Sequence, residues 1–417
     1  MPSLFDAMNL IYQLGIRLYA IAAALSAPFS EKARLWYSGR KNVFRYLSGN
    51  IGHEHPLIWV HCASLGEFEQ GRPLIEAIKK QYPKYRILLT FFSPSGYEIR
   101  KNYTLADYIC YLPSDTRKHA CRFIELIRPE KVFFIKYEYW KNYISELKKQ
   151  HIPLFIVSAI FHSGQLFFQR GLRARWYRNI LGQVDHFFVQ NQESVALLAG
   201  IGIENSTVTG DTRFDRVAEI AANRKDLPLI EKFKGDSVLI VAGSSWPPDE
   251  EILANYLNRN KQVKMIFAPH EVKESNIRRL LELLPEKAVC YSQAGEDVGR
   301  FRILVIDCIG VLSSVYRYAT IAYIGGGFGV GIHNTLEAAI YRIPVLFGPN
   351  YLKFQEAVEL VNRRLGFSVT NETQLAEQLD QLIGNKKLLS EIAEKCSIFM
   401  SGNVGATQLV IKKVFNN

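Results

Sequence analysis

The sequence contains no pair of cysteines at the spacing of a metal site or of a disulfide framework. Its six cysteines are scattered over 417 residues, and none belongs to a CxxC motif. This pattern excludes the common cysteine-based zinc modules and the small disulfide-rich scaffolds, and it favours a reducing compartment. A cleavable signal peptide, a repeat of fixed short period and a low-complexity tract are also absent from the sequence.

Acidic residues are scarce relative to basic ones. There are 40 Asp and Glu against 51 Lys and Arg, which gives a formal net charge of +11. Such a surplus favours an anionic partner, such as nucleic acid, phospholipid headgroups or a phosphorylated substrate. The basic residues do not form a recognisable RNA-binding module, which argues against nucleic acid. No acidic cluster with the character of a metal site is evident, so no metal is expected.

Length and composition predict a globular protein of two domains. Hydrophobic residues make up 48% of the chain and charged residues 22%, a balance typical of folded proteins. A chain of 417 residues is too long for one ordinary hydrophobic core.

The N-terminal region is unusually apolar. The run from Met8 to Phe29 is interrupted mainly by Gln13 and Arg17. A basic cluster follows it: Lys32, Arg34, Arg40, Lys41 and Arg45. An apolar helix beside basic residues is typical of the cytoplasmic face of a membrane. We therefore predict that residues 1–46 mediate membrane association, as a span or as a helix in the membrane plane; the alternative is a helix packed on its own domain.

The next part of the chain alternates between apolar runs and helical patterns. The predicted strands are Leu57–Ala63, Arg86–Phe92, Tyr108–Leu112, Lys131–Ile135, Pro153–Ala159, His186–Val189 and Thr207–Thr209. Helical patterns lie between most of them, for example at Phe68–Gln81, Thr116–Ile127 and Glu138–Gln150. This alternation predicts a parallel sheet covered by helices on both faces, over residues 47–216.

A second alternation follows a charged segment, Arg213–Gly235, which we interpret as a linker. Its predicted strands are Val238–Ala242, Val263–Ala268, Ala288–Tyr291, Ile303–Ile306, Thr320–Ile324 and Pro344–Phe347, and residues 371–417 are mainly helical. The predicted fold class is α/β, with two Rossmann-like domains (47–216 and 217–417) facing a cleft. Ligands of such sheets bind at the carboxyl ends of the strands.

Three polar residues of the first half follow predicted strands. Glu67 lies in Ser64-Leu-Gly-Glu67 and is a candidate general base; Glu138, in Glu138-Tyr-Trp140, would face the same cleft. Either carboxylate could instead stabilise the N-terminus of a helix. Arg213 could hold a phosphate or a carboxylate; the alternative is a structural ion pair with Asp215 or between domains.

The second half carries the features of a nucleotide site. The glycine-rich stretch Gly325–Gly331 leads to Asn334, Thr335, Leu336 and Glu337 at a predicted helix start, where free N–H groups attract an anion. Glu337 could bind the hydroxyls of a ribose. After other predicted strands come Ser244 and Ser245, then Pro269 and His270, then Ile309, Gly310 and Val311. Each of these sets also has a structural interpretation, as a helix cap, a turn or a satisfied polar residue.

The order of these motifs resembles one family, the 3-deoxy-D-manno-octulosonic acid (Kdo) transferases of lipid A assembly. The matching segments are Ser64-Leu-Gly-Glu67, Glu138-Tyr-Trp140, Gly210–Asp215, Ala268–His270, Ile309–Val311, Gly331–Glu337 and Gly348–Phe354. The resemblance covers nearly the whole chain. It implies an inverting glycosyltransferase of GT-B architecture that needs no metal.

The resemblance also implies the substrates and the residue roles. The donor would be CMP-Kdo, and the acceptor the lipid A precursor (lipid IVA), in lipopolysaccharide synthesis at the cytoplasmic face of the cell inner membrane. By position, Glu67 matches the general base, and Glu138 and Arg213 match residues that support the transition state. The segments from Pro269, from Ile309 and from Asn334 match those that bind CMP.

The sequence departs from the family pattern at four of these positions. The family has lysine at Arg213, arginine at Pro269, glutamate at Val311 and proline at Thr335. Arginine keeps the charge of lysine but not its geometry, and Pro269 and Val311 each remove a charged side chain. The contacts to CMP are therefore less secure than the role of Glu67.

Two other functions remain open on the sequence. A UDP-sugar transferase or epimerase would share the glycine loop and a ribose-binding glutamate. A non-enzymatic basic protein of a membrane surface or of nucleic acid would account for the charge. We also expect the arginines at 170, 173, 175 and 178, which lie among aromatic residues, to face the membrane or the acceptor phosphates; an ordinary solvated helix face is the alternative.

Overall fold

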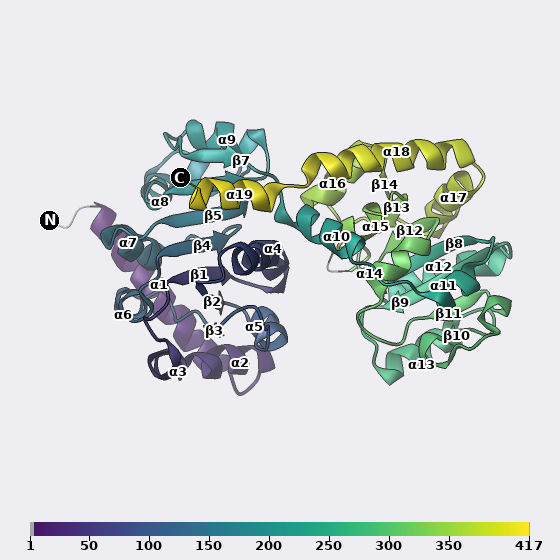
Figure 1. Cartoon of the computed structure of the whole chain (residues 1–417), viewed down its shortest axis with the longest axis horizontal. Coiled ribbons are helices and arrows are strands. Elements are labelled where there is room, and N and C mark those ends of the chain that lie inside the picture. The colour runs from purple at the N-terminus through teal and green to yellow at the C-terminus, as the bar shows by residue number, and fades with distance from the viewer. Residues whose placement is uncertain (1–3, 330, 417) are drawn as a thin grey trace. The chain divides into compact units, whose positions relative to one another are not determined.

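A computed structural model describes residues 4–329 and 331–416 of the chain. The chain forms two compact units (Figure 1): the first comprises Met1–Arg216 and Val404–Asn417, and the second Val217–Asn403. Each unit contains a seven-stranded parallel sheet with helices packed against it. The predicted α/β class is therefore confirmed.

The sheet of the first unit has the strand order β3-β2-β1-β4-β5-β6-β7. Its strands are β1 (Leu57–Cys62), β2 (Arg86–Phe91), β3 (Tyr108–Tyr111), β4 (Lys131–Ile135), β5 (Leu154–Ala159), β6 (His186–Val189) and β7 (Ser206–Val208). The order reverses between β1 and β4, which are direct neighbours in the sheet. This reversal is the topological switch point, where ligands of open α/β sheets bind.

Helices cover both faces of this sheet. They are α1 (Leu4–Ser26), α2 (Glu31–Arg40), α3 (Val43–Asn50), α4 (Leu65–Gln81), α5 (Pro94–Arg100), α6 (Arg117–Ile127), α7 (Lys141–Lys149), α8 (Leu172–Leu181), α9 (Gln192–Ala199) and α19 (Ala406–Phe415). The helix α10 (Thr212–Ala222) begins in the first unit and ends in the second. Successive residues of β1 supply two separate cores: Trp59 packs with α6 and α7, whereas Val60 packs with α4 and α19. Strands buried on both faces explain why the sequence shows continuous apolar runs.

The sheet of the second unit also has seven parallel strands but a different order, β10-β11-β9-β8-β12-β13-β14, in which β11 lies between β10 and β9. Its strands are β8 (Val238–Ser245), β9 (Val263–Pro269), β10 (Val289–Cys290), β11 (Ile303–Val305), β12 (Ile321–Ile324), β13 (Val345–Phe347) and β14 (Gly366–Ser368). Its longer helices are α11 (Pro228–Lys234), α12 (Pro247–Arg259), α13 (Glu274–Leu283), α16 (Gln355–Asn362), α17 (Glu372–Ile383) and α18 (Lys386–Asn403). The switch point lies between β8 and β12, so the loops after these strands meet there.

Two expectations about the domain boundary need correction. The segment Arg213–Gly235 is not a bare linker, because it contains most of α10 and all of α11. The last helix, α19, was expected in the second domain but belongs to the first unit. Asp215 holds its start, since the carboxylate accepts hydrogen bonds from the backbone N–H groups of Gly405 and Thr407 and from the Thr407 hydroxyl.

The N-terminal helix α1 is docked on the first unit. Among the described residues it is the one helix long and apolar enough to cross a membrane, by length and composition, over Phe5–Ser26. Yet its polar side chains bond to the unit: Asn9 accepts from the Trp176 indole at 3.0 Å, and Gln13 donates to Asn142 at 2.6 Å. The outward face is exposed and mostly apolar, at Leu10, Ile11, Leu14, Leu18, Ile21 and Leu25, although Arg17 is exposed there as well. The helix thus packs on its own domain and also presents an apolar surface.

Candidate active site

Glu67 lies in the first turn of α4, directly after β1. The turn is closed by a capping box in which Glu67 Oε2 accepts from the Ser64 backbone N–H at 2.9 Å and lies 3.3 Å from Ser64 Oγ. The capping function considered from the sequence is therefore real. Both of these contacts use Oε2, and Oε1 has no hydrogen-bond partner among the described residues. One oxygen can orient the carboxylate while the other receives a proton.

The surroundings of Glu67 give it the pKa of a base that works at neutral pH. Burial raises the pKa of the Glu67 carboxyl to about 7, and the negative charge of Glu138 adds to the rise. Lys136 and the bonds from Ser64 oppose this rise. A general base is most effective when its pKa lies near the working pH.

This pKa predicts the acid limb of the pH profile. A general base must be deprotonated, so kcat/KM should be level above about pH 7 and fall about tenfold per pH unit below it. The measurement is kcat/KM for transfer between pH 5 and 9. The Glu67→Gln variant, which has no carboxyl to titrate, should lose this limb. A wild-type profile that stays flat down to pH 5 would contradict the assignment.

Glu138 follows β4, on the other side of the switch point. Its carboxylate is almost fully buried, and Oε2 accepts from the Trp140 indole at 2.5 Å and lies 3.2 Å from Nε2 of His61. It does not lie in the first turn of α7, which begins at Lys141. Glu138 is therefore not a simple acid at a helix N-terminus. Its hydrogen-bond partners are the side chains of Trp140 and His61.

Buried polar side chains form a hydrogen-bonded series that ends at Glu138. The Trp59 indole donates to Thr90 Oγ1 at 2.8 Å, and this oxygen lies 2.8 Å from Nδ1 of His61. All hydrogen-bonding groups are satisfied when Thr90 donates to Nδ1 and His61 donates from Nε2 to Glu138. His61 and Thr90 are fully buried. The core thereby fixes the position of the Glu138 carboxylate.

Arg213 forms an ion pair, but with a different partner from the one considered. Its Nε and Nη2 donate to Asp211 Oδ2 at 2.9 and 2.6 Å, whereas Asp215 holds α19. Burial alone would raise the pKa of Asp211, but Arg213 and a bond from Gln70 hold it below its usual value. The charges of Arg213, Asp211 and Glu67 all influence the pKa of Tyr137, the residue before Glu138. All three predicted catalytic residues thus lie at one edge of one sheet.

The basic residues near the N-terminus do not act as one cluster. Lys32, Arg34, Lys41 and Arg45 are exposed, but Arg40 donates to the carbonyl oxygens of Trp36, Phe92 and Leu112. Burial lowers the pKa of Arg40 to about 9. Arg40 is therefore a structural cation that joins α2 to the loops after β2 and β3, and its expected membrane role is corrected.

In the second unit, the loops after β8 and β12 are built around a buried carboxylate. Asp249 accepts from the backbone N–H groups of Trp246 and Gly326, both at 2.9 Å, and from the Tyr323 hydroxyl. Gly326 has a positive φ of 93°, and a side chain on Gly325 would place its Cβ 2.3 Å from Ser244 O. The glycines are therefore required by close packing of the two loops.

The serines after β8 differ in their orientation. Ser245 is buried and donates to Glu250 at 2.9 Å, so its hydroxyl serves the fold and is not the phosphate donor that was expected. Ser244 is half-buried, with a positive φ of 51°. This conformation accompanies a β-bulge, because the register of β8 with β9 shifts between Gly243 and Ser245. Ser244 thus remains the serine candidate of this loop.

Three aromatic side chains stack at the carboxyl edge of the second sheet. His270, directly after Pro269 at the end of β9, stacks on Trp246 at 4.8 Å and on His333 at 4.3 Å between ring centroids. The Trp246 indole donates to Nε2 of His333 at 3.0 Å. Burial and His270 lower the pKa of His333 to about 4, so the imidazole is neutral at pH 7. His270 is exposed and forms the outer surface of the stack.

The remaining nucleotide candidates divide into buried and accessible residues. Asn334 caps the short helix Leu336–Ala339 by accepting from the Leu336 N–H, and its amide donates to Glu337 at 3.1 Å. Leu336 and Thr335 are buried, and Thr335 Oγ1 has no partner among the described residues. Ile309 is 86% exposed, Gly310 has a φ of 92°, and Val311 precedes a short helix. A ligand at this edge would meet Asn334, Glu337 and the Ile309–Val311 backbone.

Sequence reasoning missed the contributions of three residues. His61 and Trp140 contact Glu138 directly, and Trp246 completes the aromatic stack. Trp140 lies within Glu138-Tyr-Trp140, His61 is the last residue but one of β1, and Trp246 directly follows β8. These positions were the available signal, because the residue types alone do not separate packing from function.

Comparison with known proteins supports the family resemblance. A family model described as 3-deoxy-D-manno-octulosonic-acid transferase (kdotransferase) matches residues 34–216. The 3-deoxy-D-manno-octulosonic acid transferase of Aquifex aeolicus is 30% identical over 341 residues, 79% of this chain and 87% of that protein. The protein of the same name from Chlamydia trachomatis serovar D is 28% identical over 362 residues, 83% of this chain and 82% of that protein.

Solved structures share the fold. The UDP-GlcNAc 2-epimerase of Neisseria meningitidis, bound to UDP-GlcNAc, superposes with a TM-score of 0.59 at 15% sequence identity. The match covers 87% of this chain and all of that chain. A putative UDP-N-acetylglucosamine 2-epimerase from Listeria monocytogenes gives 0.57, at 15% identity, over 87% of this chain and 97% of that one. These likenesses establish the two-domain architecture.

Proposed function

Because the chain belongs to the 3-deoxy-D-manno-octulosonic acid transferase family, we propose that it transfers Kdo from CMP-Kdo to the lipid A precursor, lipid IVA. The family makes the chain a glycosyltransferase and excludes a purely non-enzymatic basic protein. The observation that carries the proposed chemistry is Glu67, whose pKa is raised to about 7 at the switch point of the first sheet.

The proposed reaction is a direct displacement with inversion. Glu67 accepts the proton of the acceptor's primary hydroxyl as the oxygen bonds to the anomeric carbon of Kdo. The bond from that carbon to the CMP phosphate oxygen breaks, and CMP leaves with the electron pair. Glu138, held by His61 and Trp140, and Arg213 support the charge that develops in the transition state. Transfer by this route needs no metal.

The proposed CMP site is the carboxyl edge of the second sheet. Ser244, His270, Asn334, Glu337 and the backbone from Ile309 to Val311 are the proposed contacts. Pro269, Thr335 and Leu336 shape the loops, and Ser245 holds Glu250. The loss of the family's arginine at Pro269 and glutamate at Val311 leaves more of this recognition to aromatic stacking and backbone groups.

A UDP-sugar enzyme is the competing proposal, because the fold is shared with UDP-GlcNAc epimerases. A thermal-shift titration of the whole chain with CMP and with UDP separates the two. We expect CMP to raise the unfolding temperature at lower concentration than UDP, since ligands stabilise the state that binds them. If UDP alone stabilises the protein, a UDP-sugar becomes the proposed donor in place of CMP-Kdo.

We also propose that the protein acts at the cytoplasmic face of the inner membrane, with α1 in the membrane plane. The bonds of Asn9 and Gln13 to the folded unit support an in-plane position, since a spanning helix would have to break them. Arg170, Arg173 and Arg175 are exposed near α8, which packs on α1. They are proposed to meet anionic headgroups or acceptor phosphates. Arg178 instead donates to the Phe167 carbonyl.

A further inference from the structure

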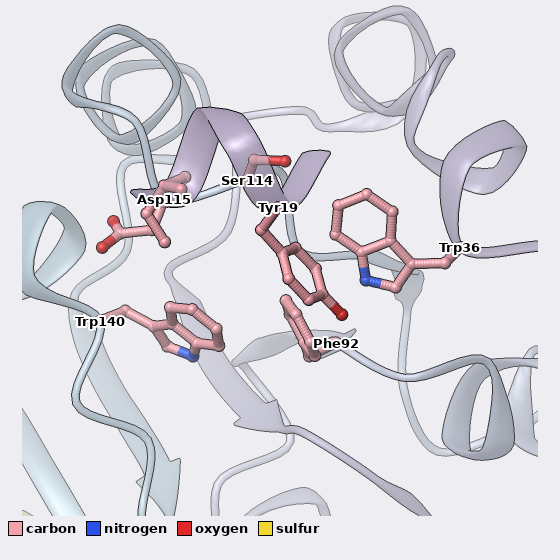
Figure 2. A pocket seen from close by; sticks show the side chains of 7 residues that line it. Tyr19, Trp36, Phe92, Ser114, Asp115 and Trp140 are labelled. Carbon is pink, nitrogen blue, oxygen red and sulfur yellow. The ribbon is translucent and has the colours of Figure 1, made fainter. Parts of the chain in front are cut away.

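An aromatic cavity lies between α1 and the candidate active site. It has a volume of about 230 Å³ and is lined by Ile16, Tyr19, Trp36, Phe92, Ser114, Asp115 and Trp140. Figure 2 shows the rings of Tyr19, Phe92, Trp36 and Trp140 grouped around it, with the Asp115 carboxylate at one side. None of these residues, apart from Trp140, has a role in the chemistry proposed above.

The lining is apolar in effect despite its acid. Asp115 is buried, and its carboxylate accepts from the Tyr12 hydroxyl and from the backbone N–H groups of Asn142 and Tyr143. These bonds use both carboxylate oxygens. The rest of the wall is mostly hydrocarbon, and aromatic contacts join Phe92 to Trp140 at 4.9 Å between centroids. A hydrocarbon ligand could therefore enter the cavity without breaking the hydrogen bonds of the Asp115 carboxylate.

The Trp36 indole belongs to the wall through its ring. Its Nε1 atom is buried and makes no hydrogen bond among the described residues, so it is not exposed to the cavity. The wall therefore offers a ligand mainly hydrocarbon and aromatic contacts. A fatty acyl chain is a ligand of this composition.

The position of the cavity connects a membrane surface to the reaction site. Its α1 wall, Ile16 and Tyr19, belongs to the helix whose outer face is exposed and apolar. Another part of the wall is Trp140, whose indole donates to Glu138. A chain bound here would leave a lipid layer along α1 and end beside the carboxylates. The proximity to Glu138 favours the acceptor over a bulk phospholipid as the occupant.

We propose that this cavity binds one acyl group of the acceptor, with its hydrocarbon chain packed against the aromatic wall. The inference rests on the proposed function, in which the acceptor is an acylated disaccharide. Acyl binding here would position the sugar hydroxyl relative to Glu67. The cavity would then select acceptors that carry chains over those that do not.

The test compares a cavity-filling variant with a matched control. Ile16→Phe narrows the cavity, whereas Ile99→Phe makes the same change at a residue of α5 that is 58% exposed. For acylated acceptor, Ile16→Phe should raise KM about tenfold, roughly the loss of two buried methylenes, with little change in kcat. Ile99→Phe should match wild type. For chemically deacylated acceptor, all three proteins should share one KM.

Two results would overturn the proposal. One is an equal KM of Ile16→Phe and Ile99→Phe for acylated acceptor. The other needs no variant: wild type that uses deacylated acceptor with the same KM as acylated acceptor. The cavity can also be tested independently of Kdo transfer, by measuring how a brominated fatty acid quenches tryptophan fluorescence. If wild type transfers no Kdo, saturable quenching weakened about tenfold by Ile16→Phe still supports the cavity, and equal quenching in both variants refutes it.

Discussion

Replacement of Glu67 by glutamine is expected to lower kcat about 10²–10⁴-fold, the usual contribution of a general base. Glutamine keeps a side-chain oxygen that can accept from the Ser64 N–H, so the capping box and the fold should survive. Glu67→Ala should lose the same activity and also about 1 kcal/mol of stability, because it removes the cap as well. Rates of Kdo transfer and thermal unfolding of both variants provide the measurement.

Glu69, two residues further along α4, provides the control for this experiment. Glu69 is also an acid of α4, but it pairs with Arg100 at 2.9 Å. Glu69→Gln should therefore keep nearly full activity. If Glu67→Gln stays near wild type while Glu67→Ala only loses stability, Glu67 is a helix cap and another group is the base.

Two charges on the outer face of α1 are expected to abolish membrane binding. Leu14 and Leu18 are 56% and 55% exposed, so Leu14→Glu/Leu18→Glu should cost little folding stability. Burial of a leucine stabilises by about 1.5–3 kcal/mol, and its replacement by a charge adds a further cost. Binding to vesicles of phosphatidylethanolamine and phosphatidylglycerol should fall by about 100-fold or more in a sedimentation assay.

A single exposed leucine elsewhere on the first unit serves as control. Leu409 in α19 is 51% exposed, and Leu409→Glu should leave vesicle binding within about twofold of wild type, as expected for a surface change away from the interface. Equal binding of the α1 double variant and wild type would refute the in-plane membrane helix. Resistance of wild type to extraction at high pH would indicate a span instead.

The sequence predicts the sheets well because their strands are buried on both faces. Continuous apolar runs such as Leu57–Ala63 and Val238–Ala242, spaced by helical patterns, are typical of the strands of a covered parallel sheet. The positions of Glu67 and Glu138 follow from the same pattern, since polar residues after neighbouring parallel strands meet at one edge. Even the reversal of strand order could be anticipated, because doubly wound sheets require one.

Long-range pairings could not be predicted in this way. Asp215 finds its partners at Gly405 and Thr407, about 190 positions along the chain, and no local pattern marks them. Arg40 resembles a surface cation in sequence, yet three backbone carbonyls surround it in the fold. The contacts of His61 depend on the register of β1 with β2 and on the backbone after β4. Side-chain partners at this level are set by tertiary packing.

Transfer of Kdo from CMP-Kdo to an acylated disaccharide can be followed directly by mass spectrometry. Freshly generated CMP-Kdo and lipid IVA are incubated with the whole chain, in the presence and absence of EDTA. We expect the acceptor to gain the mass of Kdo and CMP to be released in equal amount, with EDTA having no effect. An unchanged acceptor, under conditions where the Aquifex aeolicus relative transfers Kdo, would contradict the assignment of donor and acceptor.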